Sequence, residues 1–298
     1  MPKNIINLHR RAFLGSILVS GVAISLPALA QQTAMLKTRQ ASQPGDPTEP
    51  NRHYDSAVRD AIKKAENFEY DYSDDIFLDQ AQFALLKSCL TRLSRTQRLV
   101  GYANFNLISF DEARRYAQQY SVIGAFSQQE SEFIDYLYHV DAARYGFLGK
   151  KVSTSLTDDI RQADVHKLRG SGHYLYKGAA LQTYLKMQKT LGQQLQLTSG
   201  IRSVVKQLYL FMAKAEKSAG NLSRAARSLA PPGHSFHGIG DFDVGQRGLG
   251  AANFTNAFAQ TEIYHRLCDL GLISMRYPFA NPYGVRHEPW HIKVVKHV

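Results

Sequence analysis

Two stretches in the last third of the chain decide the fold: residues 234–243 read HSFHGIGDFD, and residues 287–292 read HEPWHI. These stretches hold two histidines and two carboxylates as candidate site residues, His237, Asp243, Glu288 and His291. Two histidines and one carboxylate are a common ligand set of catalytic zinc, with the fourth position open to water. A carboxylate that is not a ligand can take that water's proton. We therefore expect one catalytic zinc ion at these stretches, with two histidines and a carboxylate as its ligands and a further carboxylate as the general base.

The first thirty residues have the regions of an export signal. Arg10 and Arg11 are followed by Ala-Phe-Leu and a moderately apolar run, and Ala-Leu-Ala at 28–30 fits a small-residue cleavage site. This order of regions indicates a secretory signal, and the paired arginines look like a twin-arginine export signal. An uncleaved anchor is the alternative, although the run is short and interrupted for a membrane span. We expect residues 1–30 to be removed and the mature chain to be exported to the bacterial periplasm or cell wall.

The composition of the chain bears on its partners. The formal charge is +11. Lys3, Arg10 and Arg11 leave with the signal, and the mature chain remains basic. This charge favours attraction to a polyanion such as the cell wall or a membrane surface. An exported chain without a nucleic-acid motif is not expected to bind nucleic acid, and its contact with a membrane is expected only through the signal. The oligomeric state is left open by the sequence.

The two cysteines do not indicate a redox or metal motif. Cys89 and Cys268 lie far apart and lack CxxC spacing. A disulfide between them can form in an oxidising compartment. Two buried free thiols are the alternative, because each cysteine lies in an apolar helical pattern.

The rest of the chain divides by composition. Residues 31–52 are rich in Gln, Thr, Pro and Ser and are expected to be a disordered linker. Residues 53–150 have a helical pattern, with capping-box pairs Ser109–Glu112 and Ser127–Glu130, and no chemistry is visible there. Their role is left open.

Residues 151–298 mix strands and helices without a βαβ rhythm. We expect helices at 179–191, 203–219 and 254–270, strands at 195–198 and 285–296, and a strand–turn segment at 234–244. The pattern predicts an α+β domain with a small mixed or antiparallel sheet, preceded by the helical region. A region of this length can bury its own core.

Four strings in this half carry a resemblance to a known family: SGIRS, GHSFHGIGDFDVG, LGLISMRYP and GVRHEPWHIKVV. In order and spacing, from about residue 172 to 295, they look like the D-alanyl-D-alanine carboxypeptidase family of zinc peptidases, the vancomycin-resistance (VanY-like) type. The family's SxHxxGxAxD pattern implies a ligand at His237. Its ExxH pattern implies a base at Glu288 and a ligand at His291. Its SGxRS arginine, which holds substrate in related enzymes, maps onto Arg202.

One departure from the family pattern concerns the ligand Asp. The family has this Asp seven residues after the His, where this chain has Val244. We favour Asp243, because an apolar residue on each side resembles the family's strand, and this choice implies one residue lost from the turn. Asp241 is the alternative. His234 is a further alternative to His237, since Asp241 follows His234 by seven.

These residues predict the chemistry of amide hydrolysis. Zinc lowers the pKa of water to about 7 and polarises a carbonyl. Pro289 bends the chain between Glu288 and His291, so both side chains could reach the metal. Arg202 offers a planar two-pronged donor for a terminal carboxylate or an oxyanion, with a surface salt bridge as its structural alternative. Ser235 is a weaker candidate for substrate contact.

The resemblance and the site together predict an exported zinc metallopeptidase that acts on peptidoglycan stem peptides and removes a terminal D-alanine. An L,D-carboxypeptidase or an endopeptidase on wall peptides is one alternative. The other is an inactive, zinc-stabilised wall-binding module, against which the intact Glu288 and Arg202 argue.

Overall fold

The computed structural model describes residues 49–294, with side chains from Asp55 onward. The predicted signal at 1–30 lies outside the described residues, as does most of the predicted linker at 31–52. The linker prediction is wrong at its C-terminal end, because helix α1 (Glu49–Glu66) already begins there. Within the described part of the chain, no helix has the length and apolarity that a membrane crossing requires.

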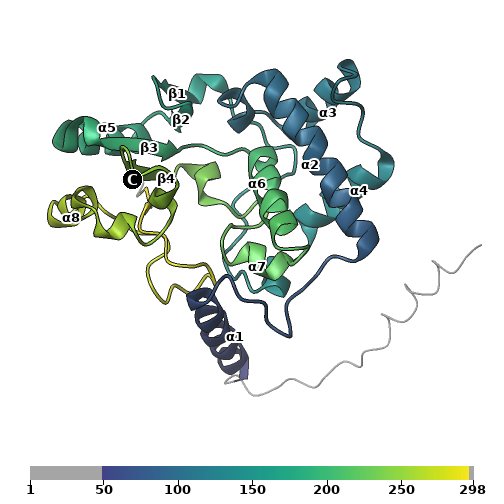
Figure 1. The fold of residues 1–298 in the computed structure, drawn as a ribbon, viewed down its shortest axis with the longest axis horizontal. Coiled ribbons are helices and arrows are strands. Elements are labelled where there is room, and N and C mark those ends of the chain that lie inside the picture. The colour runs from purple at the N-terminus through teal and green to yellow at the C-terminus, as the bar shows by residue number, and fades with distance from the viewer. Residues whose placement is uncertain (1–48, 295–298) are drawn as a thin grey trace, which may run out of the picture. The chain divides into compact units, whose positions relative to one another are not determined.

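The first half is helical, as the sequence predicts (Figure 1). After α1 come α2 (Gln80–Val100), α3 (Phe110–Gln119) and α4 (Gln128–His139). Ser109 caps α3 and Ser127 caps α4, each in a reciprocal capping box with the predicted glutamate. These boxes satisfy backbone N–H groups that the first turn of a helix leaves without partners.

The second half is an α+β arrangement with two antiparallel sheets, which confirms the predicted fold class. A two-stranded sheet pairs β1 (Val165–Leu168) with β2 (His173–Tyr176). A three-stranded sheet has the order β3 (Leu195–Ser199), β4 (Phe242–Gln246), β5 (His291–Ile292). The helices of this half are α5 (Ala179–Leu191), α6 (Val204–Lys217), α7 (Leu222–Ala226) and α8 (Glu262–Asp269).

Two predicted elements differ from the structure. The single helix expected at 254–270 is instead two short 3₁₀ helices, at Gly250–Phe254 and Phe258–Gln260, followed by α8. The Thr261 side chain accepts a hydrogen bond from the Tyr264 N–H, so a new helix starts after it. Of the strand expected at 285–296, the described part up to residue 294 contains only β5, which follows a turn at Pro289 and Trp290.

The larger hydrophobic core takes side chains from both halves of the chain. It packs residues of α2, α4, α6 and α7 together, including Leu86, Phe133, Leu137, Leu208, Phe211 and Leu222. A second cluster lies against the three-stranded sheet and includes Tyr184, Leu197, Phe242, Leu267 and Trp290. The helical region and the C-terminal region therefore share a core, and a boundary near residue 150 does not separate two independent cores.

The cysteines are both free. Cys89 is buried in the larger core, and burial raises the pKa of its thiol to about 12. Cys268 is exposed, so the alternative of two buried free thiols is right for Cys89 and wrong for Cys268.

A buried ion pair joins the segment after α1 to α7. The Arg227 guanidinium donates to both carboxylate oxygens of Asp75, at 2.7 and 2.9 Å, and the two side chains are 4% and 2% exposed. Asn221 Nδ2 donates to the same carboxylate at 2.7 Å. Burial would raise the pKa of Asp75, but the hydrogen bonds from Arg227 and Asn221 lower it.

We expect Asp75→Ala to destabilise the protein by about 3–5 kcal/mol, because Arg227 would remain buried without its counter-ion. Urea unfolding measures the loss. Asp164→Ala removes an exposed partner of Arg161 and should cost less than about 1 kcal/mol. The pKa of Asp75 is lowered on folding, so its stabilisation is present above about pH 3.8 and is lost as the pH falls through the folded pKa. Equal losses in the two variants would show that the buried ion pair contributes no more to the free energy of unfolding than the exposed one.

Candidate functional site

The strand register places the candidate ligands together. Asp243 lies in β4, the central strand of the three-stranded sheet, opposite Ser199 of β3 on one side and His291 of β5 on the other. His237 comes from a short 3₁₀ helix, Phe236–Ile239, that directly precedes β4. Each of these side chains is thus held by regular structure rather than by a free loop.

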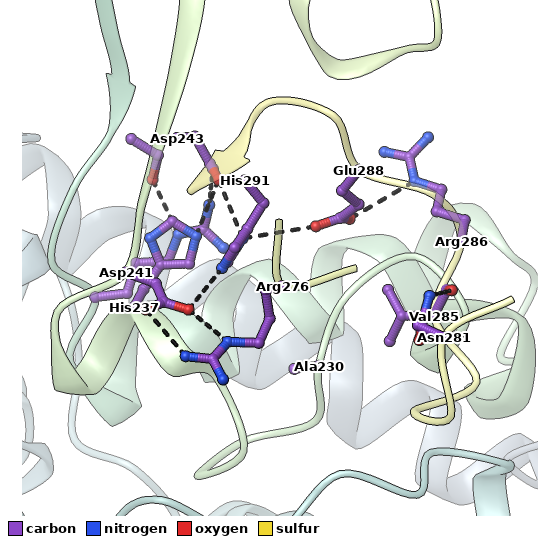
Figure 2. A network of polar contacts seen from close by, with 12 residues as sticks. Ala230, His237, Asp241, Asp243, Arg276, Asn281, Val285, Arg286, Glu288 and His291 are labelled. Atoms are coloured by element: carbon purple, nitrogen blue, oxygen red, sulfur yellow. Dashed lines mark hydrogen bonds and ion pairs between the residues drawn. The ribbon is translucent and has the colours of Figure 1, made fainter. Parts of the chain in front are cut away.

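His237, Asp243 and His291 form a compact buried cluster (Figure 2). Their ligand-type atoms lie within 4.8 Å of one another, and all three residues are at most 2% exposed. Asp243 Oδ1 is 3.3 Å from His237 Nε2 and 3.2 Å from His291 Nδ1.

The two atoms His237 Nε2 and Asp243 Oδ1 are buried and have no hydrogen-bond partner among the described residues. Buried polar atoms are normally paired, so these two orphaned atoms fit a cation held between the three side chains. The donor set of two imidazoles and one carboxylate suits zinc.

Each histidine is oriented by a partner outside the cluster. His237 Nδ1 is 2.8 Å from the carbonyl oxygen of Gly200. A carbonyl only accepts, so Nδ1 carries the hydrogen and Nε2 presents its lone pair to the cluster. His291 Nε2 is 3.2 Å from Asp241 Oδ2, which leaves Nδ1 of His291 for the cluster. Such outer partners fix the ring orientation of metal-binding histidines.

Charge in the cluster is set by burial and by the neighbouring groups. Burial, with Arg202 nearby, lowers the pKa of His237 to about 4, so this ring is neutral. Burial would lower the pKa of His291 as well, but Asp241 and Asp243 raise it to about 9. Without a metal ion the cluster therefore holds one positive charge on His291, which a bound cation would replace.

Asp241, the alternative ligand, lies outside the cluster and supports it. Its Oδ2 accepts from Arg276 Nε at 2.8 Å and contacts His291, while Oδ1 accepts from the Val294 N–H at 2.9 Å. Burial would raise its pKa, but the hydrogen bonds from His291 and Arg276 lower it to about 2. Asp241 is therefore an ionised group that orients His291 from behind.

His234, the alternative to His237, lies away from the cluster. Its Nδ1 is 2.9 Å from the Gly149 carbonyl oxygen, and its ring packs edge-on against Phe147. These contacts make it part of the packing around the loop at residue 149.

Glu288 lies beside the cluster at the start of a turn. The His291 N–H donates to the Glu288 carbonyl at 3.1 Å, which closes the turn around Pro289. As a result, Glu288 Oε2 is 3.7 Å from His291 Nδ1. Burial and the charge of Asp243 raise the pKa of Glu288 to about 7, against the opposing effect of Arg286 and His291. A carboxylate of this pKa can both accept and return a proton near neutrality.

Arg202 holds the far side of Asp243. Its Nη2 donates to Asp243 Oδ2 at 2.8 Å, and its Nε donates to Ser199 Oγ at 3.0 Å. This pairing is buried rather than on the surface, with the Arg202 side chain 12% exposed. The sequence predicts Arg202 as a substrate residue but does not reveal this second task.

A cavity of about 370 Å³ opens onto these side chains. Both histidines, Asp243, Glu288, Arg202 and Ser235 line it, so every site residue predicted from the sequence faces one space. Trp290 and Tyr277 form part of its wall. Sequence reasoning missed Arg276 and Tyr277, although both stand in the LGLISMRYP string, and it also missed Lys206 and Arg286.

The two aspartates lie at different positions relative to the cluster, and this difference predicts different effects on zinc binding. We expect Asp243→Asn to abolish tight zinc binding, because it replaces the negatively charged carboxylate ligand by a neutral amide. Asp241→Asn should weaken zinc binding by about 10- to 100-fold, the usual effect of losing a partner that orients a ligand. Competition titration with a zinc chelator measures both. If Asp241→Asn empties the site while Asp243→Asn does not, the ligand assignment is wrong.

A known family matches the C-terminal part of the chain. Residues 173–297 match the family model VanY, described as D-alanyl-D-alanine carboxypeptidase, which confirms the resemblance seen in the sequence. The match supports a peptidase and does not extend to the helical half. No curated protein matches the chain.

Similar solved structures include the LD-carboxypeptidase LdcB, at 25% identity over 46% of this chain and 70% of that chain, with a TM-score of 0.38. The vancomycin-resistance D,D-pentapeptidase VanY in complex with Zn(II) has 25% identity over 44% of this chain and 77% of that chain, with a TM-score of 0.35. VanYB in complex with D-alanine-D-alanine has 24% identity over 48% of this chain and 81% of that chain, with a TM-score of 0.37.

Proposed function

We propose that the chain is an exported zinc peptidase that hydrolyses peptidoglycan stem peptides and removes a terminal D-alanine. The observation that carries the proposal is the buried His237–Asp243–His291 cluster, with two orphaned ligand atoms and the raised pKa of Glu288 beside it. The family match over residues 173–297 supports the reaction class. Residues 1–30 support export by their sequence alone.

The side chains divide the work of amide hydrolysis. Zinc held by the two histidines and Asp243 would polarise the carbonyl group of the substrate and lower the pKa of a water molecule. Glu288 takes the proton of the attacking water and returns it to the leaving amine. Arg202 holds Asp243 in place and presents positive charge to the oxyanion that develops on the carbonyl oxygen. The Ser235 hydroxyl is a substrate contact in the cavity wall.

Digestion of purified muropeptides with the zinc-loaded protein tests the proposal, with products identified by mass. Loss of one alanine from pentapeptides is the expected result, and the Glu288→Gln protein is the control. Loss of alanine from tetrapeptides only would instead indicate an L,D-carboxypeptidase, and cleavage of cross-links would indicate an endopeptidase. An inert zinc-loaded protein that still binds purified cell wall would contradict the proposal and favour a wall-binding module.

A further inference from the structure

The cavity that holds the His237–Asp243–His291 cluster has a strongly cationic lining. Four long cationic side chains line it: Arg202, Lys206, Lys214 and Arg286. Arg202 pairs with Asp243 at 2.8 Å, Lys214 with Glu69 at 3.1 Å, and Arg286 Nε lies 3.8 Å from Glu288 Oε1. Among the described residues, no carboxylate forms an ion pair with Lys206.

The position of Lys206 is costly without a counter-ion. The side chain is partly buried, and its Nζ lies 5.3 Å from the ring centre of Tyr209 and 5.7 Å from that of Phe105. Burial and the neighbouring charge of Arg202 lower the pKa of Lys206 to about 8. The two rings offset part of the cost of burying a cation and hold the amine in place. An anionic group of a ligand would offset the remainder.

The order of contacts across the cluster assigns a direction to the substrate. Arg286 and Glu288 lie at one end, and Figure 2 shows Arg286 beside Glu288. Glu288 is followed by His291 at 3.7 Å, and His291 by Asp243 at 3.2 Å. Arg202 then contacts Oδ2 of Asp243, and the charge of Arg202 lies close enough to Lys206 to lower the pKa of its amine.

This order places the two parts of the substrate. Glu288 protonates the leaving amine, so the leaving residue and its terminal carboxylate lie at the Glu288 end, where the Arg286 guanidinium lies 3.8 Å from Glu288. The acyl part of the peptide then extends toward Arg202 and Lys206. A substrate carboxylate that binds Lys206 therefore belongs to the acyl part of the peptide.

We infer that Lys206 is a specificity-determining residue that binds a side-chain carboxylate on the acyl side of the scissile bond, so that the preferred substrates are anionic peptides rather than a bare dipeptide. This inference rests on the proposed function, since it uses the peptide direction that Glu288 defines. A charged hydrogen bond in a partly buried site favours the charged peptide by about tenfold or more.

The test compares two isosteric peptides, acetyl-Glu-D-Ala-D-Ala and acetyl-Gln-D-Ala-D-Ala, which differ in one charge. We expect the wild type to prefer the Glu peptide by about tenfold in kcat/KM, through KM rather than kcat. Lys206→Met should abolish the preference, and Lys206→Arg should retain most of it. Lys217→Met is the matched control, because Lys217 is an exposed lysine of the same helix that does not line the cavity, and it should keep the preference.

A binding measurement separates this inference from the proposed function. The affinity of the zinc-loaded Glu288→Gln protein for both peptides is measured by calorimetry, with and without Lys206→Met. A preference for the Glu peptide that disappears with Lys206→Met supports the inference, even if the wild type hydrolyses neither peptide and the proposed function fails. Three results would overturn it. The first two are no preference in the wild type and an unchanged preference in Lys206→Met. The third comes from the same peptides with an amidated C-terminus: if Lys206→Met weakens binding only when the terminal carboxylate is free, Lys206 binds that carboxylate and not the side chain.

Discussion

Glu288→Gln is expected to lower kcat by roughly 10²- to 10⁴-fold while leaving the zinc content unchanged. The substitution keeps the shape of the side chain and the turn that His291 closes on the Glu288 carbonyl. It removes only the group that can accept a proton. Steady-state kinetics on a wall peptide and metal analysis of the same preparation measure the two effects.

The control for this variant is Glu262→Gln, which makes the same chemical change at an exposed position in the first turn of α8. It should keep both activity and zinc. A Glu288→Gln protein without zinc would show that Glu288 is a ligand, and the mechanism proposed above would then be wrong. A fully active one would show that another group moves the proton.

His291→Ala is expected to lose zinc and activity together. The change removes one of three ligands and also leaves Asp241 and Asp243 facing each other without the ring between them. Chelation of the wild type should abolish activity, and added zinc should restore it, whereas zinc should not restore the variant. Metal analysis, with thermal unfolding in the presence and absence of zinc, measures the loss, because a ligand that binds the folded state raises its stability.

His287→Ala is the matched control for this second variant. His287 stacks on the exposed Phe279 ring and contacts Asn256, and its substitution should leave zinc bound. Full zinc occupancy in His291→Ala would contradict the ligand set. Activity of the wild type that survives complete removal of metal would contradict the metallopeptidase proposal itself.

The sequence identifies the residues that cluster more readily than it identifies the partners around them. Residues 237, 243, 288 and 291 lie in two short strings, and all but Asp243 have the spacing of the family pattern. The apolar neighbours of Asp243 predict a strand there, and its register brings Asp243 opposite His291. Local signals suffice there. Capping boxes are equally local, which explains why α3 and α4 begin where the sequence predicts.

The partners of the site residues depend on contacts between distant segments. The Arg202–Asp243 pair joins residues 41 positions apart, and the Lys206 amine lies near the Phe105 ring, which belongs to the helical half. Neither the hydrophobic periodicity nor a motif in the sequence predicts such contacts. The shared core is likewise invisible to a segment-by-segment reading, because each half is apolar enough to suggest a core of its own.

The two histidines of the cluster differ in whether a mutation can remove the group that orients them. His237 is oriented by the backbone carbonyl of Gly200, and a side chain added at Gly200 would bring its Cβ to 2.1 Å from the Tyr174 carbonyl oxygen. A single codon change can delete the Asp241 carboxylate that orients His291, but none can delete a carbonyl. Natural variants and laboratory evolution should therefore adjust metal affinity through Asp241 and Arg276, while Gly200 stays invariant among active descendants.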